Sequence, residues 1–315
     1  MNETYLAIDL GRSELLIGEV SAEGKILHSK RYEAGYINQG TALSIIKRLL
    51  EDYITTEGWI NGKRPISMGL SLLGYVDNVR GTWLRINSKS NQPTPLAHDL
   101  FQVYGMPCYI GNNIRNITRA VKLWGNGKQS DNFTYINIST SIEAGFVVNG
   151  QLVCDNQSEP GAIGHIDTGL DIGVICNCGL NNCTESIAGG AGFDKSARLF
   201  SGTYSSNLYI PKDEKIKVDI KQVYFLSQQG DELCVKLVEN AVSAISNLII
   251  TLVEVNRVNT IILGGDIVSN GFIYPKIIKK LNKDAGHSIT KGILLSQFNS
   301  EYAGLIGAAA VAMNK

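Results

Sequence analysis

Residues 164–183 read GHIDTGLDIGVICNCGLNNC, and this stretch is the most informative part of the chain. It holds one histidine and three cysteines with the spacing H-x10-C-x-C-x4-C, in a chain that has six cysteines and four histidines in all. Three thiolates and one imidazole fill the four positions of a tetrahedral zinc ion and leave none open to water. The pattern therefore predicts structural zinc held by His165, Cys176, Cys178 and Cys183. The alternative is a buried histidine beside three loop cysteines; the turn-forming residues between the cysteines favour zinc.

Composition limits the classes of protein that fit this chain. Its 315 residues suffice for two domains with a large apolar core. The 29 basic residues balance the 29 acidic ones, so no overall field attracts nucleic acid or an anionic membrane. The start of the chain lacks a basic segment followed by an apolar one, and no stretch approaches eighteen uninterrupted apolar residues. We expect a soluble cytoplasmic protein without membrane or direct nucleic-acid contacts.

The order of predicted elements is similar in the two halves of the chain. The first half predicts strands at residues 5–10, 15–20, 26–32 and 66–72, with a helix from about residue 41. The second predicts strands at residues 135–139, 145–148 and 151–154, and a long helix at 233–255 whose apolar stripe we assign to core packing. This repetition indicates two α/β lobes with a cleft between them.

Two further features lie near the end of the chain. A predicted strand at 260–263 runs into Gly264 and Gly265, and residues 303–310 form a helix of small side chains. Glycines at a strand-to-helix junction permit close approach of a ligand, and a helix N-terminus attracts phosphate. A tight turn and a close helix contact explain the same residues equally well.

Several motifs resemble those of the ROK family (repressors, open reading frames, kinases). GAIGH at 161–165 followed by CNCGLNNCTES at 176–186 is similar to the family signature GEIGH…CxCGxxGCxE. Other pieces follow in family order along essentially the whole chain: AIDLGRS at 7–13, MGLSLLGYVD at 68–77, YIGNN at 109–113, STSIEAGFVVNGQL at 139–152, ILGGD at 262–266 and AGLIGAA at 303–309.

The resemblance implies a two-lobed, actin-like and hexokinase-like (ribonuclease H-like) α/β fold. The smaller lobe would contain residues 1–117 and 299–315, and the larger lobe, with the zinc, residues 118–298. It also implies a sugar or sugar phosphate as ligand and assembly into a homo-oligomer.

The chain departs from the family pattern at the catalytic base. Family kinases have an Asn-Asp pair, whose aspartate accepts the proton of the attacking sugar hydroxyl. Here the pair is Asn112 and Asn113. An amide can hold a hydroxyl but cannot accept its proton, and a positioned base contributes about 10²–10⁴-fold to rate.

The two phosphate loops are also altered. The first, D-x-G-G-T in the family, retains Asp9, Gly11 and a hydroxyl at Ser13, but has Arg12 in place of a glycine. The second, G-T-G-I-G in the family, retains Thr140, lacks the three glycines and gains Glu143. Glycines let backbone N–H groups approach phosphate, and a carboxylate repels it. We expect Mg-ATP only if the protein is a kinase, with Gly264 and Gly265 as further phosphate-binding positions.

The expected sugar-binding residues are partly retained. The glutamate of GEIGH is Ala162 here, whereas the positions of its histidine and of the family's second sugar-binding glutamate are filled by His165 and Glu185. The resemblance also implies amide contacts to sugar, from Asn87, Asn112 and Asn113.

These departures favour a catalytically inactive, pseudokinase-like ROK protein. It would act as a sugar sensor or transcriptional-regulator-like protein without a DNA-binding domain of its own. The alternative is an ATP-dependent sugar kinase of the glucokinase, fructokinase or N-acetylhexosamine kinase type. A third hypothesis is an interaction protein that retains the fold and zinc but binds no ligand.

Overall fold

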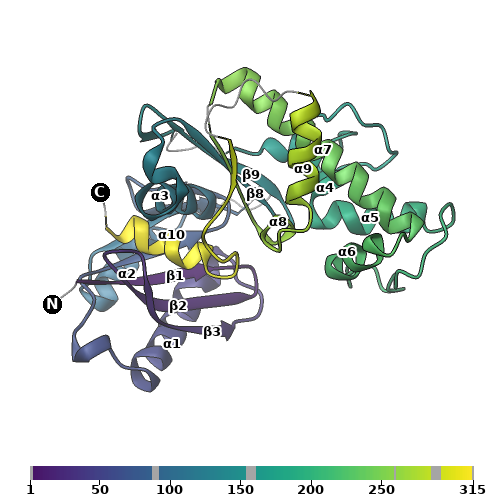
Figure 1. The fold of residues 1–315 in the computed structure, drawn as a ribbon. Coiled ribbons are helices and arrows are strands. Elements are labelled where there is room, and N and C mark those ends of the chain that lie inside the picture. Colours follow the sequence, from purple (N-terminus) through teal and green to yellow (C-terminus); the bar gives the residue numbers. More distant parts are fainter. Residues whose placement is uncertain (1–2, 87–91, 154–160, 259, 285–291, 314–315) are drawn as a thin grey trace. The chain divides into compact units, whose positions relative to one another are not determined.

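The computed structural model describes residues 3–86, 92–153, 161–258, 260–284 and 292–313, drawn as a ribbon in Figure 1. The chain forms two compact units: residues 1–131, 147–160 and 297–315 make the first, and residues 132–146 and 161–296 the second. The sequence places the first boundary at residue 117. The structure keeps the chain in the first unit up to residue 131, because α3 (Asn113–Trp124) packs against α10 (Ala303–Ala312) in that unit.

A five-stranded sheet in the order β3-β2-β1-β4-β7 forms the centre of the first unit. The first three strands are antiparallel, and β1, β4 and β7 run parallel, so the carboxyl ends of these three strands meet at one edge. A separate hairpin pairs β5 with β6. The strands are β1 (Thr4–Leu10), β2 (Glu14–Ser21), β3 (Ile26–Glu33), β4 (Ser67–Leu72), β5 (Tyr75–Asp77), β6 (Thr82–Arg85) and β7 (Cys108–Asn112).

Alternation along β1 determines which helices cover which face of this sheet. Leu6, Ile8 and Leu10 join a core with α1 (Gln39–Thr56) and α2 (Leu96–Tyr104). Ala7, on the other face, packs against the small residues of α10. Figure 1 shows α10, in yellow, lying along the strands, close to α3. This alternation places Asp9 on the α10 face.

The second sheet has the order β10-β9-β8-β11-β12. Strands β8, β11 and β12 run parallel, and β10 pairs with the last residues of β9, which belong to the first unit. The strands are β8 (Phe133–Ile138), β9 (Ile142–Val148), β10 (Gln151–Leu152), β11 (Ile261–Gly264) and β12 (Ile293–Leu295).

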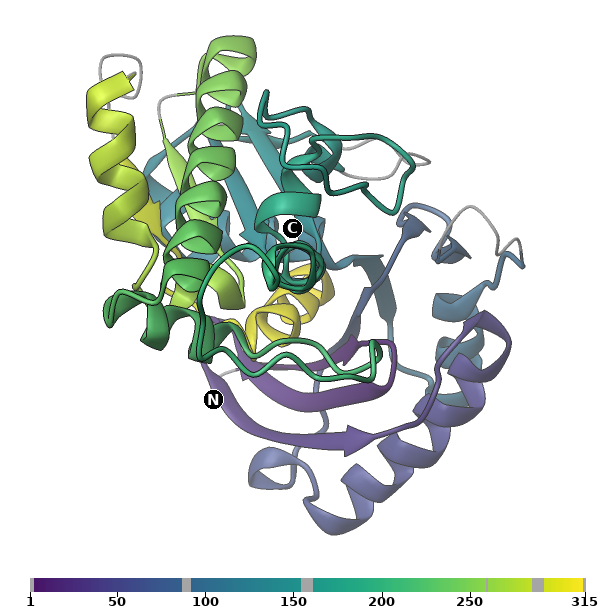
Figure 2. The same cartoon turned by 90° about the vertical axis from the view of Figure 1, so that its right-hand side faces the viewer.

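Among the described residues of the second unit, six helices pack around its core. They are α4 (Thr184–Ala188), α5 (Gly190–Phe200), α6 (Ile220–Gln228), α7 (Glu232–Asn256), α8 (Asp266–Ser269) and α9 (Tyr274–Asp284). The long α7 contacts α4, α5, α6 and α9 and is seen along its length in Figure 2. It is long and apolar enough to span a membrane, yet 61% of its most apolar window is buried inside the unit, as in a core helix. The prediction that its apolar stripe packs in the core is confirmed.

Candidate metal centre and ligand-binding residues

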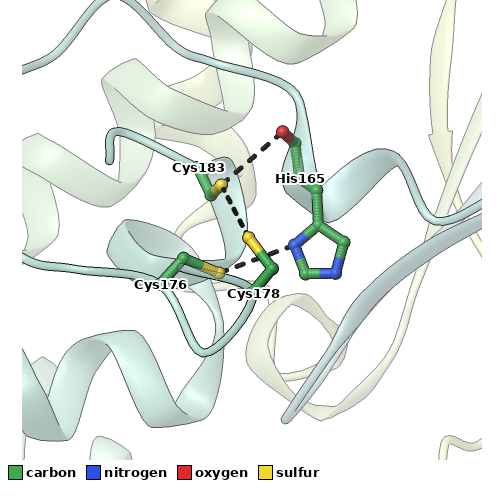
Figure 3. Close-up of side chains that lie close together, drawn as sticks. All are labelled: His165, Cys176, Cys178 and Cys183. Atoms are coloured by element: carbon green, nitrogen blue, oxygen red, sulfur yellow. Dashed lines mark hydrogen bonds between the residues drawn. The ribbon is translucent and has the colours of Figure 1, made fainter. Parts of the chain in front are cut away.

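The four predicted metal ligands lie together in the second unit. Figure 3 shows the side chains of His165, Cys176, Cys178 and Cys183 turned toward one another. Their ligand atoms all lie within 4.8 Å of one another. The Sγ of Cys176 is 3.5 Å from Nδ1 of His165, and the Sγ of Cys178 is 3.7 Å from that of Cys183.

Local backbone geometry explains why these side chains converge. The Cys176 amide donates to the Leu180 carbonyl and the Gly179 amide to the Cys176 carbonyl, which closes a tight turn around Cys178. Gly179 has a φ of +92°, a conformation that glycine adopts without strain. Cys183 directly precedes α4, and the 3₁₀ turn Ile163–His165 presents the histidine. The loop thus supplies ligands from three backbone segments.

Two of the separations agree with the edges of a zinc coordination tetrahedron. With Zn–S bonds of about 2.3 Å and Zn–N bonds of about 2.0–2.1 Å, neighbouring ligand atoms lie about 3.5–3.8 Å apart. The two measured separations fall in this range. Burial raises the pKa of the Cys183 thiol to about 12, so a cation is needed to hold this residue as a thiolate at neutral pH. The residues present therefore fit a Cys₃His metal site.

A lysine outside the predicted ligand set supports this loop. The Nζ of Lys195, on α5, donates to the Ile175 carbonyl at 3.0 Å and to Oδ1 of Asn177 at 2.8 Å. These acceptors flank Cys176, so Lys195 fixes the loop on both sides of this cysteine. The cysteine spacing gives no signal for this residue, because Lys195 follows the motif by more than ten residues.

The turn that corresponds to the second phosphate loop of the family is held by α4. Residues 139–141 connect β8 to β9, and Oε2 of Glu185 accepts a hydrogen bond from the Ile142 amide at 3.1 Å. The Gly190 amide donates to the Ser139 carbonyl. The Ser141 hydroxyl donates to Glu143 at 3.3 Å. Thr140 is exposed in this turn, and its carbonyl lies beside Gly189.

Gly264 and Gly265 are explained by packing. A Cβ on Gly264 would lie 2.2 Å from the Tyr135 hydroxyl oxygen, and one on Gly265 would lie 2.3 Å from the Ile138 carbonyl. Gly265 also has a φ of +93°. Both glycines therefore let the end of β11 approach β8, which is the tight-turn explanation of this motif. Whether they also bind phosphate stays a prediction.

Asp9 stands at the carboxyl end of β1, against the first turn of α10. A Cβ on Gly304 would lie 2.1 Å from Asp9 Oδ2, so glycine is required for the helix to approach this carboxylate. Burial raises the pKa of Asp9 to about 6, and the charge of Arg31 lowers it in part. Asp9 is thus a largely enclosed carboxyl group, and its ionisation destabilises the folded protein.

The rest of the first phosphate loop forms the hairpin turn between β1 and β2. The Gly11 amide donates to the Glu14 carbonyl, and the carbonyls of Arg12 and Ser13 accept from residues 37 and 34. The side chains of Arg12 and Ser13 are exposed. A small cavity of about 30 Å³ opens beside this turn and is lined by Leu10, Gly11, Arg12, Tyr36, Ile37, Leu73, Trp83 and Ile86.

The two asparagines at the start of α3 have different surroundings. Asn112 is 2% exposed and caps α3: its Oδ1 accepts from the amides of Ile114 and Arg115, and its Nδ2 donates to the Gly74 carbonyl. Asn113 is half-buried, and its Oδ1 accepts from the Ile114 amide. Asn112 therefore holds the strand end in place, and Asn113 is the more accessible amide. Asn87, the third predicted amide, lies outside the described residues.

A buried polar network links these strand ends. Nδ2 of Asn116 donates to the carbonyls of Leu70 and Gly111 and lies 3.1 Å from the Ser71 hydroxyl, which in turn donates to the Gly304 carbonyl. The network joins β4, β7 and α3 to the helix that packs against Asp9. Sequence reasoning missed Ser71 and Asn116, since neither belongs to a residue pattern with a recognised chemistry.

The sequence matches the model of the ROK family over residues 5–315. The chain belongs to the ROK family. The glucokinase of Thermotoga maritima is 24% identical to this ROK protein over 273 residues, which cover 85% of this chain and 83% of that enzyme.

Solved structures show the same fold. A ROK family transcriptional regulator described as a homologue of the E. coli MLC protein has a TM-score of 0.82 and 22% identity, and the match covers 98% of this chain and 78% of that one. A ROK family glucokinase from Streptomyces griseus, in complex with glucose and AMPPNP, has a TM-score of 0.76 and 21% identity, over 99% and 100% of the chains. The predicted family and the predicted α/β fold of the hexokinase-like ROK structures are confirmed.

Proposed function

We propose that this ROK protein binds a hexose-type sugar and transfers phosphate to it slowly from Mg-ATP. We prefer this kinase to the inactive sensor because the sequence is similar to that of a glucokinase along 85% of the chain. The single structural observation that carries the proposal is Asp9, an enclosed carboxylate at the edge where three parallel strands end. Open α/β sheets bind ligands at the edge where the strands have their carboxyl ends. An ionised carboxylate at this edge can bind Mg²⁺.

On the family resemblance, the groups that we assign to sugar recognition are the Asn113 amide, the Glu185 carboxylate and the His165 imidazole. Asn113 can donate from Nδ2 to the attacking hydroxyl and orient it. Asn113 cannot accept the proton of this hydroxyl, which must instead be transferred to a phosphate oxygen or to water. Phosphoryl transfer depends mainly on positioning and charge stabilisation, so the reaction survives without the base at a rate lower by about 10²–10⁴-fold.

We also propose that the His/Cys cluster holds zinc in a structural role. The ligand separations of 3.5 and 3.7 Å support it, and four protein ligands leave no position for a substrate. Homo-oligomer assembly and a cytoplasmic location remain predictions of this proposal.

A second candidate is a sugar sensor without catalysis. Asn113 in place of the base and Glu143 beside the 139–141 turn favour it, because the first removes the proton acceptor and the second places an acidic group near that turn. Such a protein would bind sugar and act on a regulatory partner.

Two measurements separate the candidates. Thermal-shift titrations with hexoses, N-acetylhexosamines, their 6-phosphates and Mg-ATP report which ligands stabilise the fold by mass action. ³¹P NMR of the same mixtures over hours then reports any sugar phosphate formed. Stabilisation by sugar and Mg-ATP with slow product formation supports the kinase; stabilisation by sugar with no product supports the sensor. No stabilisation by any sugar would overturn both.

A further inference from the structure

Three segments of the second unit meet at the side chain of Glu185. Glu185 is the second residue of α4 and follows the cysteine Cys183 by two positions. A Cβ on Gly164 would lie 3.0 Å from both Cβ and Oε2 of Glu185, so the 3₁₀ turn that presents His165 packs directly on this side chain. The Ile142 amide, at the start of β9, donates to Oε2 at 3.1 Å.

The Ile142 hydrogen bond ties a short turn to the segments that carry the metal ligands. Residues 139–141 are stabilised within themselves by the Ser139 amide, which donates to the Ser141 carbonyl, and from α5 by the Gly190 amide. From α4, the side chain of Glu185 holds the end of this turn by accepting the hydrogen bond of Ile142. A backbone N–H that loses its acceptor is costly to leave unpaired, so the orientation of the turn depends on this carboxylate.

We propose that Glu185 is a positioning residue that transmits sugar binding to the 139–141 turn. A carboxylate has two oxygens: Oε2 holds Ile142, while Oε1 accepts no hydrogen bond from the described residues. A sugar hydroxyl that donates to Oε1 restricts rotation of the side chain, and the restricted carboxylate holds the Ile142 amide more firmly. The sugar part rests on the proposed function; the Glu185–Ile142 link does not.

Amide hydrogen exchange of Ile142 in the full chain tests the link without any ligand. Glu185→Ala is expected to accelerate this exchange about tenfold, the size of one net hydrogen bond. Glu185→Gln keeps an oxygen acceptor and should stay within about threefold of the unmodified protein. Glu239→Ala, which removes an exposed glutamate on α7, is the matched control and should leave the rate unchanged.

Two results would overturn the link: unchanged Ile142 exchange in Glu185→Ala, or exchange in Glu185→Gln as fast as in Glu185→Ala. If Glu185→Ala does not fold, Glu185→Asp serves instead, because its carboxylate is one methylene short of the amide and should also accelerate exchange.

The same measurement with a saturating sugar tests the coupling. The sugar that raises the melting temperature should slow Ile142 exchange in the unmodified protein and leave it unchanged in Glu185→Ala. A bound sugar that leaves this rate the same, or raises it, overturns the coupling while the proposed sugar binding stands. If no sugar binds, the proposed function fails and the coupling with it, whereas the ligand-free comparison still decides the Glu185–Ile142 link.

Discussion

Asp9 should make the protein less stable as pH rises from about 4 to 7. The side chain is enclosed between β1 and α10, and burial raises its pKa from 3.8 to about 6, against the opposing charge of Arg31. In the unfolded chain the carboxyl titrates near its ordinary value. Between these two pKa values the folded state binds more protons than the unfolded state, so the free energy of unfolding falls with rising pH.

The size of the effect follows from the two pKa values. A difference of about two pH units corresponds to about 3 kcal/mol, because each unit is worth 1.36 kcal/mol. This stability is present below about pH 4 and is lost by about pH 7. Asp9→Asn keeps the shape and removes the charge, so it should stabilise the protein at pH 7 by up to about 3 kcal/mol and have little effect at pH 4.

Urea unfolding followed by circular dichroism at several pH values between 4 and 8 measures this difference. Glu23→Gln, at an exposed turn of the same unit, removes an equal charge and controls for changes in net charge. Stability curves of the Asp9→Asn variant and the unmodified protein that run parallel across this pH range would refute the reasoning, as would a variant that is less stable at pH 7.

Three further predictions concern the base, the metal and a buried ion pair. Asn113→Asp should raise sugar-dependent ADP release by about 10²–10⁴-fold; an unchanged rate with both ligands bound would place the defect in the phosphate loops. Cys178→Ser should abolish zinc binding, measured by elemental analysis, and lower the melting temperature, whereas Cys108→Ala should keep the zinc; retained zinc in Cys178→Ser would exclude this ligand set. Asp194, 3% exposed, accepts hydrogen bonds from Arg198, Lys217 and the Val218 amide. Burial raises its pKa, but these partners outweigh burial and lower it overall, so its stabilisation is present at neutral pH and lost as pH falls below 3.8. Asp194→Asn should therefore cost about 3 kcal/mol or more at pH 7 and less at pH 3, measured by urea unfolding.

The sequence was sufficient to predict the strands and helices that have a clear local pattern of apolar residues. The apolar alternation predicts a strand at residues 5–10, and β1 covers Thr4–Leu10. The helical stripe at 233–255 predicts α7, found at Glu232–Asn256. The clustering of His165 with three cysteines was also predictable, because four residues of the right chemistry lie within nineteen positions and a turn-rich loop brings them together.

The partners of the polar side chains were not predictable in this way. Glu185 binds an amide 43 positions earlier, and Asn116 binds a carbonyl 46 positions earlier, so no local spacing connects either pair. Asn112 resembles a ligand-binding amide in sequence, yet it caps a helix, and its neighbour Asn113 keeps the greater exposure. Asparagine serves both as a ligand-binding residue and as a helix cap, so the sequence alone does not separate the two roles.

Asp9 and Asn113 lead to opposite expectations about kinase activity. Considered together, they specify the expected activity more closely than either residue does alone. An enclosed carboxylate without a hydrogen bond from the described residues lowers stability at neutral pH, and a divalent cation is the ligand that would offset this cost. Asn113 carries no such cost, because its amide is uncharged and its oxygen accepts a hydrogen bond from the Ile114 amide. The first residue favours retained Mg-ATP binding, and the second favours loss of the base. A protein with both features should hold sugar and nucleotide while reacting slowly, so stability in the presence of Mg²⁺ is more informative about its function than the rate alone.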